Sequence, residues 1–331
     1  MTEQNSTPLQ TETSTEVSTE VPKEKFRLVT RSDFDGLVCA VLLEELDLID
    51  EIVFVHPKDM QDGKIEITKR DITTNLPYVP GAHMVFAHHE SEAVRNSGRR
   101  DVNHIIEVHA PSAARVVYNY YGGAPTFPRI TEEMMAAVDQ ADSAQYSRED
   151  ILEPQGWVLL NYIMDARTGL GRFRDFRISN YALMMSLISC CASYTIEEIL
   201  ALPDVKERVD LYHAHEAKAK EQILHCACQI GNLVILDLRN EETIWAANRF
   251  LIYALFPTAN ISIHVIWGLK KQNTVLAGGK SILDRSSQTH VGNMMLEFGG
   301  GGHAAAGTCQ IANEKADGML TMLIERINRD G

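Results

Sequence analysis

The stretch FRLVTRSDFDGLVCAVLL, residues 26–43, contains the patterns of a strand, a turn and a helix in direct succession. Residues 26–30 are mostly apolar and predict a buried strand, whereas Ser32-Asp33-Phe34-Asp35-Gly36 has the composition of a turn. The apolar run Leu37–Leu46 then predicts a helix. This order is typical of the first unit of an α/β protein.

Short β-rich runs continue to alternate with helical patterns through the first half of the chain. Ile52–Val55 and Met84–Ala87 predict further strands, and residues 112–121 and 131–141 predict helices. Such alternation indicates a mostly parallel sheet flanked by helices, whose ligands bind at the carboxyl ends of the strands.

A helical middle and a second, smaller α/β unit are expected after that. Residues 181–191 and 204–229 have helical patterns, and the strand–helix alternation begins again at Gly231. We expect Gly278-Gly279 to form the turn of a hairpin between strands at 275–277 and 281–283. Further strands are expected at 232–238 and 261–267, and helices at 245–255 and 291–298. The predicted organisation is a disordered tail at 1–24, a first domain at 25–192, a helical linker at 193–229, and an α/β domain with a mixed sheet at 230–331.

The composition places the chain among soluble globular proteins and excludes some functions. Hydrophobic residues make up 45% of the 331 residues, but no apolar run is long enough to span a membrane. The six cysteines lack the spacing of a disulfide framework, which is typical of a cytoplasmic protein. A formal net charge of −14 argues against stable binding of duplex DNA, although a local cationic site can still bind a polyanion.

Two short motifs carry candidate chemistry. Asp33 and Asp35 lie on one tight turn, where two carboxylates can hold hard cations, although a turn-forming Asp cluster is the alternative. His88 and His89 directly follow a predicted strand, and so would emerge at the same edge of the sheet. A core histidine beside an exposed one is the alternative for that pair.

In this order, the motifs resemble those of the DHH phosphoesterases. Residues 32–36 resemble the first motif of that family, residues 85–90 its Asp-His-His motif, and Asp142 in ADSAQY its fourth motif. Asp71 is the best match to the aspartate of the second motif, ahead of Asp59 and Asp62. Residues 298–307, FGGGGHAAAG, resemble the glycine-rich signature of the DHH-associated C-terminal domain.

The resemblance implies two divalent ions, most often Mn²⁺, with Mg²⁺ or Co²⁺ as substitutes. The implied metal ligands are Asp33, Asp35, Asp71, His88 and Asp142. His89 is expected to contact the phosphoryl group or the leaving group, so the expected catalytic positions are His89, Asp142 and Ala87. The implied substrate contacts, on the other side of a cleft between the domains, are Arg285, Ser286, Gly300, Gly301, Gly302 and His303.

Two positions depart from the family pattern. Arg31 lies where relatives have a further metal ligand, and it either points into the site, or faces solvent or an acidic neighbour. Ala87 stands where the family motif has its aspartate. In relatives, that carboxylate would orient the histidine or the metal-bound water, and its loss would lower metal affinity or activity by about 10- to 100-fold. The sequence does not separate a natural divergence from an engineered change at Ala87.

The expected function is therefore hydrolysis of a phosphodiester by a metal-activated water. Short oligonucleotides or small nucleotide phosphates are the expected substrates, and inorganic polyphosphate is the alternative. A non-catalytic nucleotide-binding or phosphate-binding regulator is the second alternative, because of Ala87. A homodimer is compatible with the sequence. The basic run Arg167, Arg172, Arg174 and Arg177 could guide a polyanion or be solvated surface.

Overall fold

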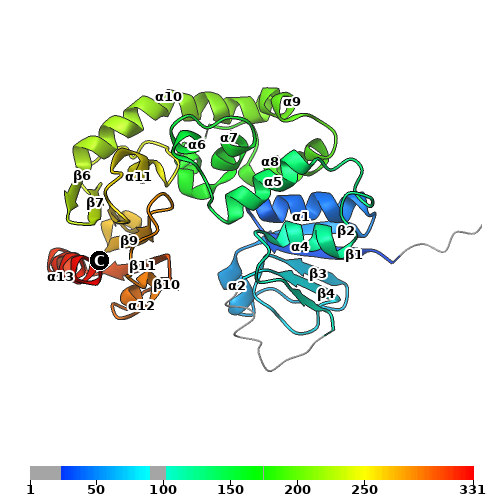
Figure 1. The fold of residues 1–331 in the computed structure, drawn as a ribbon, viewed down its shortest axis with the longest axis horizontal. Coiled ribbons are helices and arrows are strands. Elements are labelled where there is room, and N and C mark those ends of the chain that lie inside the picture. The colour runs from blue at the N-terminus through cyan, green and yellow to red at the C-terminus, as the bar shows by residue number, and fades with distance from the viewer. Residues whose placement is uncertain (1–23, 90–101, 174) are drawn as a thin grey trace, which may run out of the picture.

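The two halves of the protein are each built on one β-sheet (Figure 1). The computed structural model describes residues 24–89, 102–173 and 175–331. The first sheet has the strand order β2-β1-β3-β4-β5, and all of its pairs are parallel. The second has the order β10-β11-β9-β8-β7-β6, with a parallel β7–β8 pair among antiparallel ones. The predicted α/β class, with a parallel and then a mixed sheet, is confirmed.

The first half buries α1 in a largely apolar core. Its strands are β1 (Phe26–Arg31), β2 (Ile49–Val55), β3 (Asp71–Thr74), β4 (Met84–Ala87) and β5 (His104–Ile106). Helix α1 (Phe34–Glu45) begins after the N-cap residue Asp33 and is buried from Phe34 to Leu43. It packs against α4 (Ala113–Tyr120), α5 (Glu132–Asp142) and α8 (Asn180–Cys191). The short helices α2 (Pro57–Gln61), α6 (Arg148–Leu152) and α7 (Gly156–Met164) complete this half.

A long helix leads from the first half to the second. Helix α9 (Ile196–Ala201) is followed by α10 (Pro203–Cys226), which runs from the helices of the first half to β6 (Figure 1). Its buried residues recur at helical spacing, and they include Val205, Arg208, Tyr212, His215 and Ala219. The helix ends three residues before the predicted Gln229, because Ala227 is already extended and begins β6. No helix in the described ranges is both long and apolar enough to cross a bilayer.

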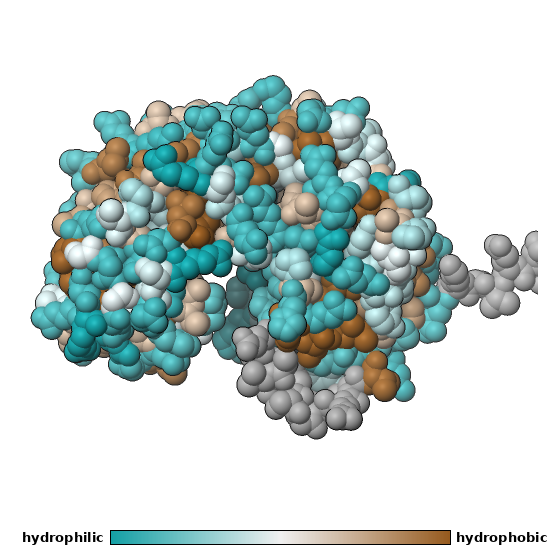
Figure 2. Space-filling view, viewed as in Figure 1, coloured by the Kyte–Doolittle hydropathy of each residue, from teal (hydrophilic) through white to brown (hydrophobic). Residues whose placement is uncertain are grey.

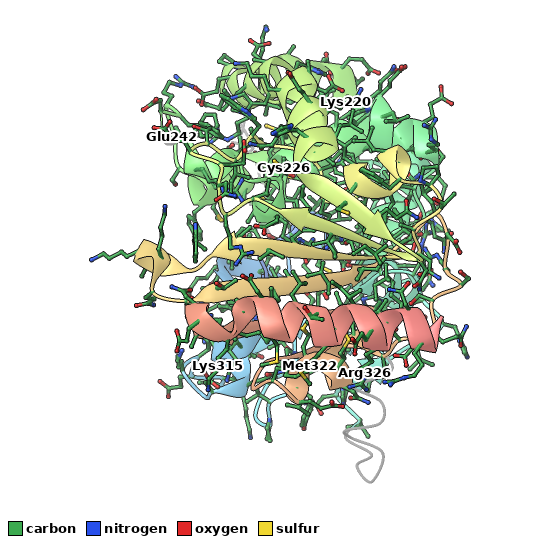
Figure 3. All side chains as sticks on the ribbon, turned by 90° about the vertical axis from the view of Figure 1, so that its left-hand side faces the viewer. Lys220, Cys226, Glu242, Lys315, Met322 and Arg326 are labelled. Carbon is green, nitrogen blue, oxygen red and sulfur yellow. The ribbon has the colours of Figure 1, made fainter. Side chains whose placement is uncertain are left out.

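The second half packs helices against a mixed sheet. Its strands are β6 (Ala227–Ile230), β7 (Leu233–Asp237), β8 (Ile261–Trp267), β9 (Thr274–Lys280), β10 (Gly301–His303) and β11 (Ala306–Ile311). Helix α13 (Ala316–Asp330) lies along these strands (Figure 3) and buries Leu323 and Ile327. The other helices are α11 (Leu251–Leu255) and α12 (Val291–Leu296).

Two predictions for this half are wrong. Gly278 and Gly279 lie inside the single strand β9, and residues 281–283 are not a strand. A Cβ on Gly278 would lie 2.8 Å from the Met295 side chain, so glycine there permits α12 to pack closely and does not form a turn. The predicted helix 245–255 shrinks to Leu251–Leu255, since backbone N–H groups such as that of Ala247, which donates to Thr168 O, bond outside the segment.

Asp71 lies at the wrong end of its strand for a metal ligand. Asp71 pairs in register with Arg27, near the start of β1, whereas Asp33 follows the far end of that strand. The strand from Arg27 to Arg31 spans about 13 Å, and this length separates Asp71 from the edge where Asp33 lies. The Asp71 carboxylate accepts from Arg27 Nε at 2.6 Å and from the backbone N–H of Thr68 at 2.6 Å. The prediction that Asp71 joins the metal ligands is therefore wrong. The weaker candidates Asp59 and Asp62 form ion pairs with Lys64 and Lys58 near α2.

We expect Asp71→Ala to destabilise the protein without changing its metal affinity. Removing the carboxylate leaves Arg27 partly buried and unpaired, which should lower the free energy of unfolding by about 2 to 4 kcal/mol. Burial raises the pKa of Asp71, but bonds from Arg27 and Thr68 outweigh burial and hold that pKa below its ordinary value. This stability is therefore present above about pH 4 and is lost as the pH falls through the folded-state pKa. Urea unfolding and Mn²⁺ calorimetry test both halves of the expectation.

The exposed pair of Asp62 with Lys58 supplies the control. Asp62→Ala should leave the urea midpoint of unfolding close to that of the unaltered chain, because an exposed ion pair contributes little to stability. Weaker Mn²⁺ binding by Asp71→Ala at unchanged stability would contradict the structural role.

Candidate active site

The carboxyl ends of β1, β3 and β4 meet at one edge of the first sheet. Asp33 follows β1 and is the N-cap of α1, where its carboxylate accepts from Gly36 N at 3.0 Å. Asn75 directly follows β3, and its Nδ2 donates to Asp33 Oδ1 at 3.2 Å. His88 directly follows β4. Parallel strands therefore bring together polar residues that are far apart in sequence.

Asp35 is fixed by the start of another helix. It is 2% exposed, and its two carboxylate oxygens accept from the backbone N–H groups of Ala113 at 3.0 Å and Ala114 at 2.7 Å. These are the first residues of α4, whose N–H groups have no partner within the helix. The helix end thus stabilises a buried negative charge in a fixed orientation.

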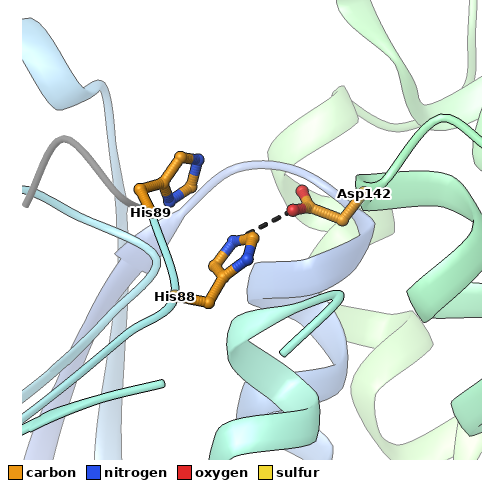
Figure 4. Close-up of side chains that lie close together, drawn as sticks. All are labelled: His88, His89 and Asp142. Atoms are coloured by element: carbon orange, nitrogen blue, oxygen red, sulfur yellow. Dashed lines mark ion pairs between the residues drawn. The ribbon is translucent and has the colours of Figure 1, made fainter. Parts of the chain in front are cut away.

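His88 presents one ring nitrogen to the carboxylates (Figure 4). Its Nδ1 lies 3.2 Å from Ala110 O, which assigns the Nδ1 proton to that bond. Its Nε2 lies 3.0 Å from Asp142 Oδ2 and 4.0 Å from Asp35 Oδ2. The contact with Asp142 has the distance of an ion pair but not the angle of a hydrogen bond, so the buried Nε2 has no hydrogen-bond partner among the described residues. A bare imidazole nitrogen facing two carboxylates is a position that suits a cation.

The electrostatics of the group also favour a cation. Burial and the neighbouring carboxylates raise the pKa of Asp35 well above its ordinary value, and burial raises that of Asp33 despite the opposing charge of Arg31. Burial lowers the pKa of His88, but the close contact with Asp142 and the charge of Asp35 outweigh it, so this pKa is raised. Burial is the main cause of the raised pKa of both carboxylates. The raised pKa of His88, and the part of the rise at Asp35 that comes from Asp142 and Asp33, indicate negative charge at this edge.

Asn75 is a site residue that the sequence reasoning missed. Its Oδ1 is buried without a hydrogen-bond partner in the described part of the chain, while its Nδ2 holds Asp33. Its backbone φ of 54° is unusual for a residue other than glycine. A signal was present, since Asn75 is the first polar residue after its strand that can ligate through oxygen, just as Asp33 and His88 follow theirs.

The remaining predicted residues of the first half lie at the same edge. Asp142 ends α5, and a ligand atom from each of His88, His89 and Asp142 lies within 4.8 Å of the other two. His89 is exposed, and its ring centroid is 4.2 Å from that of His88. Ala87 is buried as the last residue of β4. Oxygen and imidazole donors without thiolates suit Mn²⁺ or Mg²⁺, so the residues present fit a divalent ion of this kind.

Arg31 both pairs with an acidic neighbour and points toward the site, which the sequence had left as alternatives. Its Nε lies 2.9 Å from Asp33 Oδ2, so it pairs with an acidic neighbour. Asp33 belongs to the candidate site, so the guanidinium group of Arg31 lies at the rim of the carboxylate cluster.

The second half faces this edge across a recess in the surface (Figure 2). His303 lies in β10, and partial burial of its ring together with the charges of Arg31, His290 and Arg167 lowers its pKa. Arg285 donates from Nη2 to Ala144 O at 2.9 Å, in the turn that follows Asp142. Ser286 accepts from Asn260 at 3.0 Å through its hydroxyl. In this structure, Arg285 and Ser286 therefore bond to protein groups.

Two glycines of the run have a packing role. A Cβ on Gly300 would lie 2.0 Å from Thr308 O, and one on Gly302 would lie 2.2 Å from Ala306 O. These two glycines permit the close pairing of the β10–β11 hairpin. Gly301 has open space at its Cβ position.

Comparison with solved structures decides the family. The pGpG-specific phosphodiesterase PggH from Vibrio cholerae is 62% identical, with a TM-score of 0.84 over 93% of this chain and 100% of that one. The chain belongs to the DHH family of phosphoesterases. RecJ from Thermus thermophilus, solved with Mn²⁺, shares the DHH fold at 12% identity, with a TM-score of 0.52 over 93% of this chain and 52% of its own. CDC45 from Entamoeba histolytica has a TM-score of 0.50 at 10% identity, over 92% of this chain and 95% of its own. Neither a protein-family model nor a curated protein matches the sequence.

Two uncharged residues lie side by side in this DHH site. The backbone N–H of Asn75 donates to Phe86 O at 3.2 Å, which brings Asn75 next to Ala87, the first position of the Asp-His-His motif. The negative charge of the described edge therefore comes from Asp33, Asp35 and Asp142.

We expect Asp142→Asn to weaken Mn²⁺ binding by about tenfold or more, because it removes a charge that faces His88 Nε2. Isothermal titration calorimetry on the folded variant measures this loss directly.

Asp139 provides a matched control one turn earlier on α5. Its carboxylate binds Arg115 at 2.8 Å and Ser112 at 2.7 Å and not the histidines. Asp139→Asn should leave Mn²⁺ affinity close to that of the unaltered chain. Equal losses in the two variants would argue against Asp142 as a ligand.

Proposed function

We propose that this DHH phosphoesterase is a divalent-metal-dependent phosphodiesterase whose preferred substrate is a short oligonucleotide of the pGpG type. The observation that carries the proposal is the 62% identity to the pGpG-specific phosphodiesterase over that protein's whole length. Identity at this level extends over both sides of the recess between the halves, and both sides would contact a dinucleotide.

The proposed metal ligands are Asp33, Asp35, His88 and Asp142, and Asn75 Oδ1 joins them in place of Asp71. We propose Mn²⁺ as the physiological ion, with Mg²⁺ or Co²⁺ as substitutes and two ions in the active form. When bound, such ions supply a water of lowered pKa and neutralise charge on the phosphodiester. The unpartnered atoms His88 Nε2 and Asn75 Oδ1 support this assignment.

The protein's own groups orient the reaction. Helix α4 fixes Asp35 through two backbone N–H groups, so this carboxylate keeps its direction without water. His89 is exposed beside His88, where it can donate to a phosphoryl oxygen or to the leaving oxygen. We propose that His303 holds the substrate from the second half, with Gly301 as the glycine that leaves room for it.

A substrate panel with Mn²⁺ tests the proposed function. The panel contains pGpG, a nucleoside bisphosphate, a cyclic dinucleotide and inorganic polyphosphate, and we expect the highest kcat/KM for pGpG. Asp35→Asn should abolish turnover of pGpG, because it removes a buried ligand charge while leaving a side chain of similar size. Hydrolysis of polyphosphate without hydrolysis of pGpG would overturn the proposal.

Ala87 allows a second test, of how far the altered motif limits the reaction. We expect Ala87→Asp to raise Mn²⁺ affinity or turnover of pGpG by about 10- to 100-fold, because it adds a carboxylate beside Asn75 and His88. Ala87→Asn controls for the size of the new side chain without its charge. If Ala87→Asp folds and does not exceed Ala87→Asn in either quantity, the aspartate is not needed in this chain.

A further inference from the structure

Two arginines near the carboxylate cluster share an uncommon arrangement. The guanidinium group of each is held by a carboxylate through Nε. In Arg31 this atom lies 2.9 Å from Asp33 Oδ2, and in Arg167 it donates to Asp165 Oδ1 at 2.8 Å and Oδ2 at 3.0 Å. Neither arginine donates a hydrogen bond from Nη1 or Nη2 to any residue within the described ranges. Both side chains are partly exposed, at 34% and 49%.

The charges of both arginines influence the same two side chains, Asp33 in the first half and His303 in the second. The charges of Arg31 and Arg167 each oppose the rise in the pKa of Asp33, and each contributes to the lowered pKa of His303.

Geometry places both arginines at the metal-ligand edge. Asn161 Nδ2 donates to Tyr146 Oη at 2.7 Å, and the backbone N–H of Asp165 donates to Asn161 O at 3.0 Å. Asp165 and the Arg167 that it holds therefore lie next to the segment that follows Asp142, while Arg31 contacts Asp33 directly.

The other described arginines of the basic run are engaged elsewhere. Arg172 lies against Ile244 O at 3.5 Å, and Arg177 pairs with Asp204 on α10 through Nε and a terminal nitrogen. Arg174 lies outside the described residues. Arg167 is thus the described member of the run with free terminal donors near the site.

The terminal phosphate of a dinucleotide is a suitable ligand for the free Nη donors of Arg31 and Arg167. Two divalent ions would carry four positive charges against the three carboxylates of Asp33, Asp35 and Asp142, which leaves about one charge for the phosphodiester that is cut. A terminal phosphate monoester carries a further −1.5 to −2 charge, roughly, at pH 7. Guanidinium groups with unbonded Nη atoms match phosphate oxygens in both charge and geometry.

We propose that Arg31 and Arg167 form a subsite for the terminal phosphate of the substrate, which is not the one that is cut. The subsite would make the enzyme select dinucleotides that carry a 5′-phosphate. This inference rests on the proposed function, and it assigns the terminal-phosphate specificity to Arg31, where the chain departs from the family pattern, and to Arg167, outside the family motifs.

The test compares pGpG with GpG, which lacks the terminal phosphate. We expect the unaltered chain to prefer pGpG. Arg167→Gln should lower kcat/KM for pGpG by roughly 10- to 100-fold, mainly through KM, because a charge-assisted contact is lost. It should change kcat/KM for GpG far less, so the preference for pGpG should collapse.

Arg70→Gln controls for the loss of one positive charge. Arg70 pairs with Asp50 and Glu51, beside the amino ends of the strands, so its replacement should preserve the preference for pGpG. Arg31→Gln should also collapse the preference, and Mn²⁺ calorimetry on that variant separates its effect on substrate from its effect on Asp33.

The outcomes separate this inference from the proposed function. If Arg167→Gln lowers kcat/KM for both dinucleotides equally, the arginine supports the site in general, and the subsite is wrong although the function stands. If the unaltered chain hydrolyses pGpG and GpG equally well, the subsite is also wrong. If it hydrolyses neither dinucleotide, the proposed function itself fails.

Discussion

The attachment of Asp35 to the start of α4 is the interaction on which the site depends. A carboxylate this deeply buried would be costly without compensation, and two backbone N–H groups together with the helix dipole provide it. The same contact ties the first strand–turn–helix unit to a helix that begins 78 residues later in the chain. Local turn geometry and tertiary packing are therefore not independent here, because disturbing either one moves the carboxylate.

The fold was largely predictable because its signals are local. The run from Phe26 to Leu46 predicts a strand, a turn and a helix in that order, and the structure has this order, but α1 begins at Phe34, inside the predicted turn at 32–36. The errors arise where tertiary contacts override local preference. Gly278 and Gly279 are typical of a turn, yet the close approach of α12 requires glycine within β9. In the same way, residues 245–250 have apolar content suited to a helix, but the N–H groups of Trp245, Ala246 and Ala247 bond to other segments.

The site was predictable only in part, for a geometric reason. Motifs whose residues directly follow a strand, such as Asp33 and His88, could be placed from the sequence, because a strand end fixes the edge that they reach. Asp71 was chosen for its chemical type, but it begins β3, whereas Asn75 directly follows the end of that strand. A carboxylate one strand length away from the edge cannot bind the same ion, whatever its charge. Position along the strand therefore outranks residue type in choosing ligands.

The absence of a carboxylate at both Asn75 and Ala87 sets the charge balance of the described edge. Five carboxylates would more than compensate the four positive charges of two divalent ions, whereas the described edge has three, at Asp33, Asp35 and Asp142. Arg31, paired with Asp33, offsets part of even this charge. The balance of the site therefore shifts toward positive potential once ions are bound. A site of that kind suits a substrate with more than one phosphate, because the additional negative charge of the ligand supplies what the protein lacks.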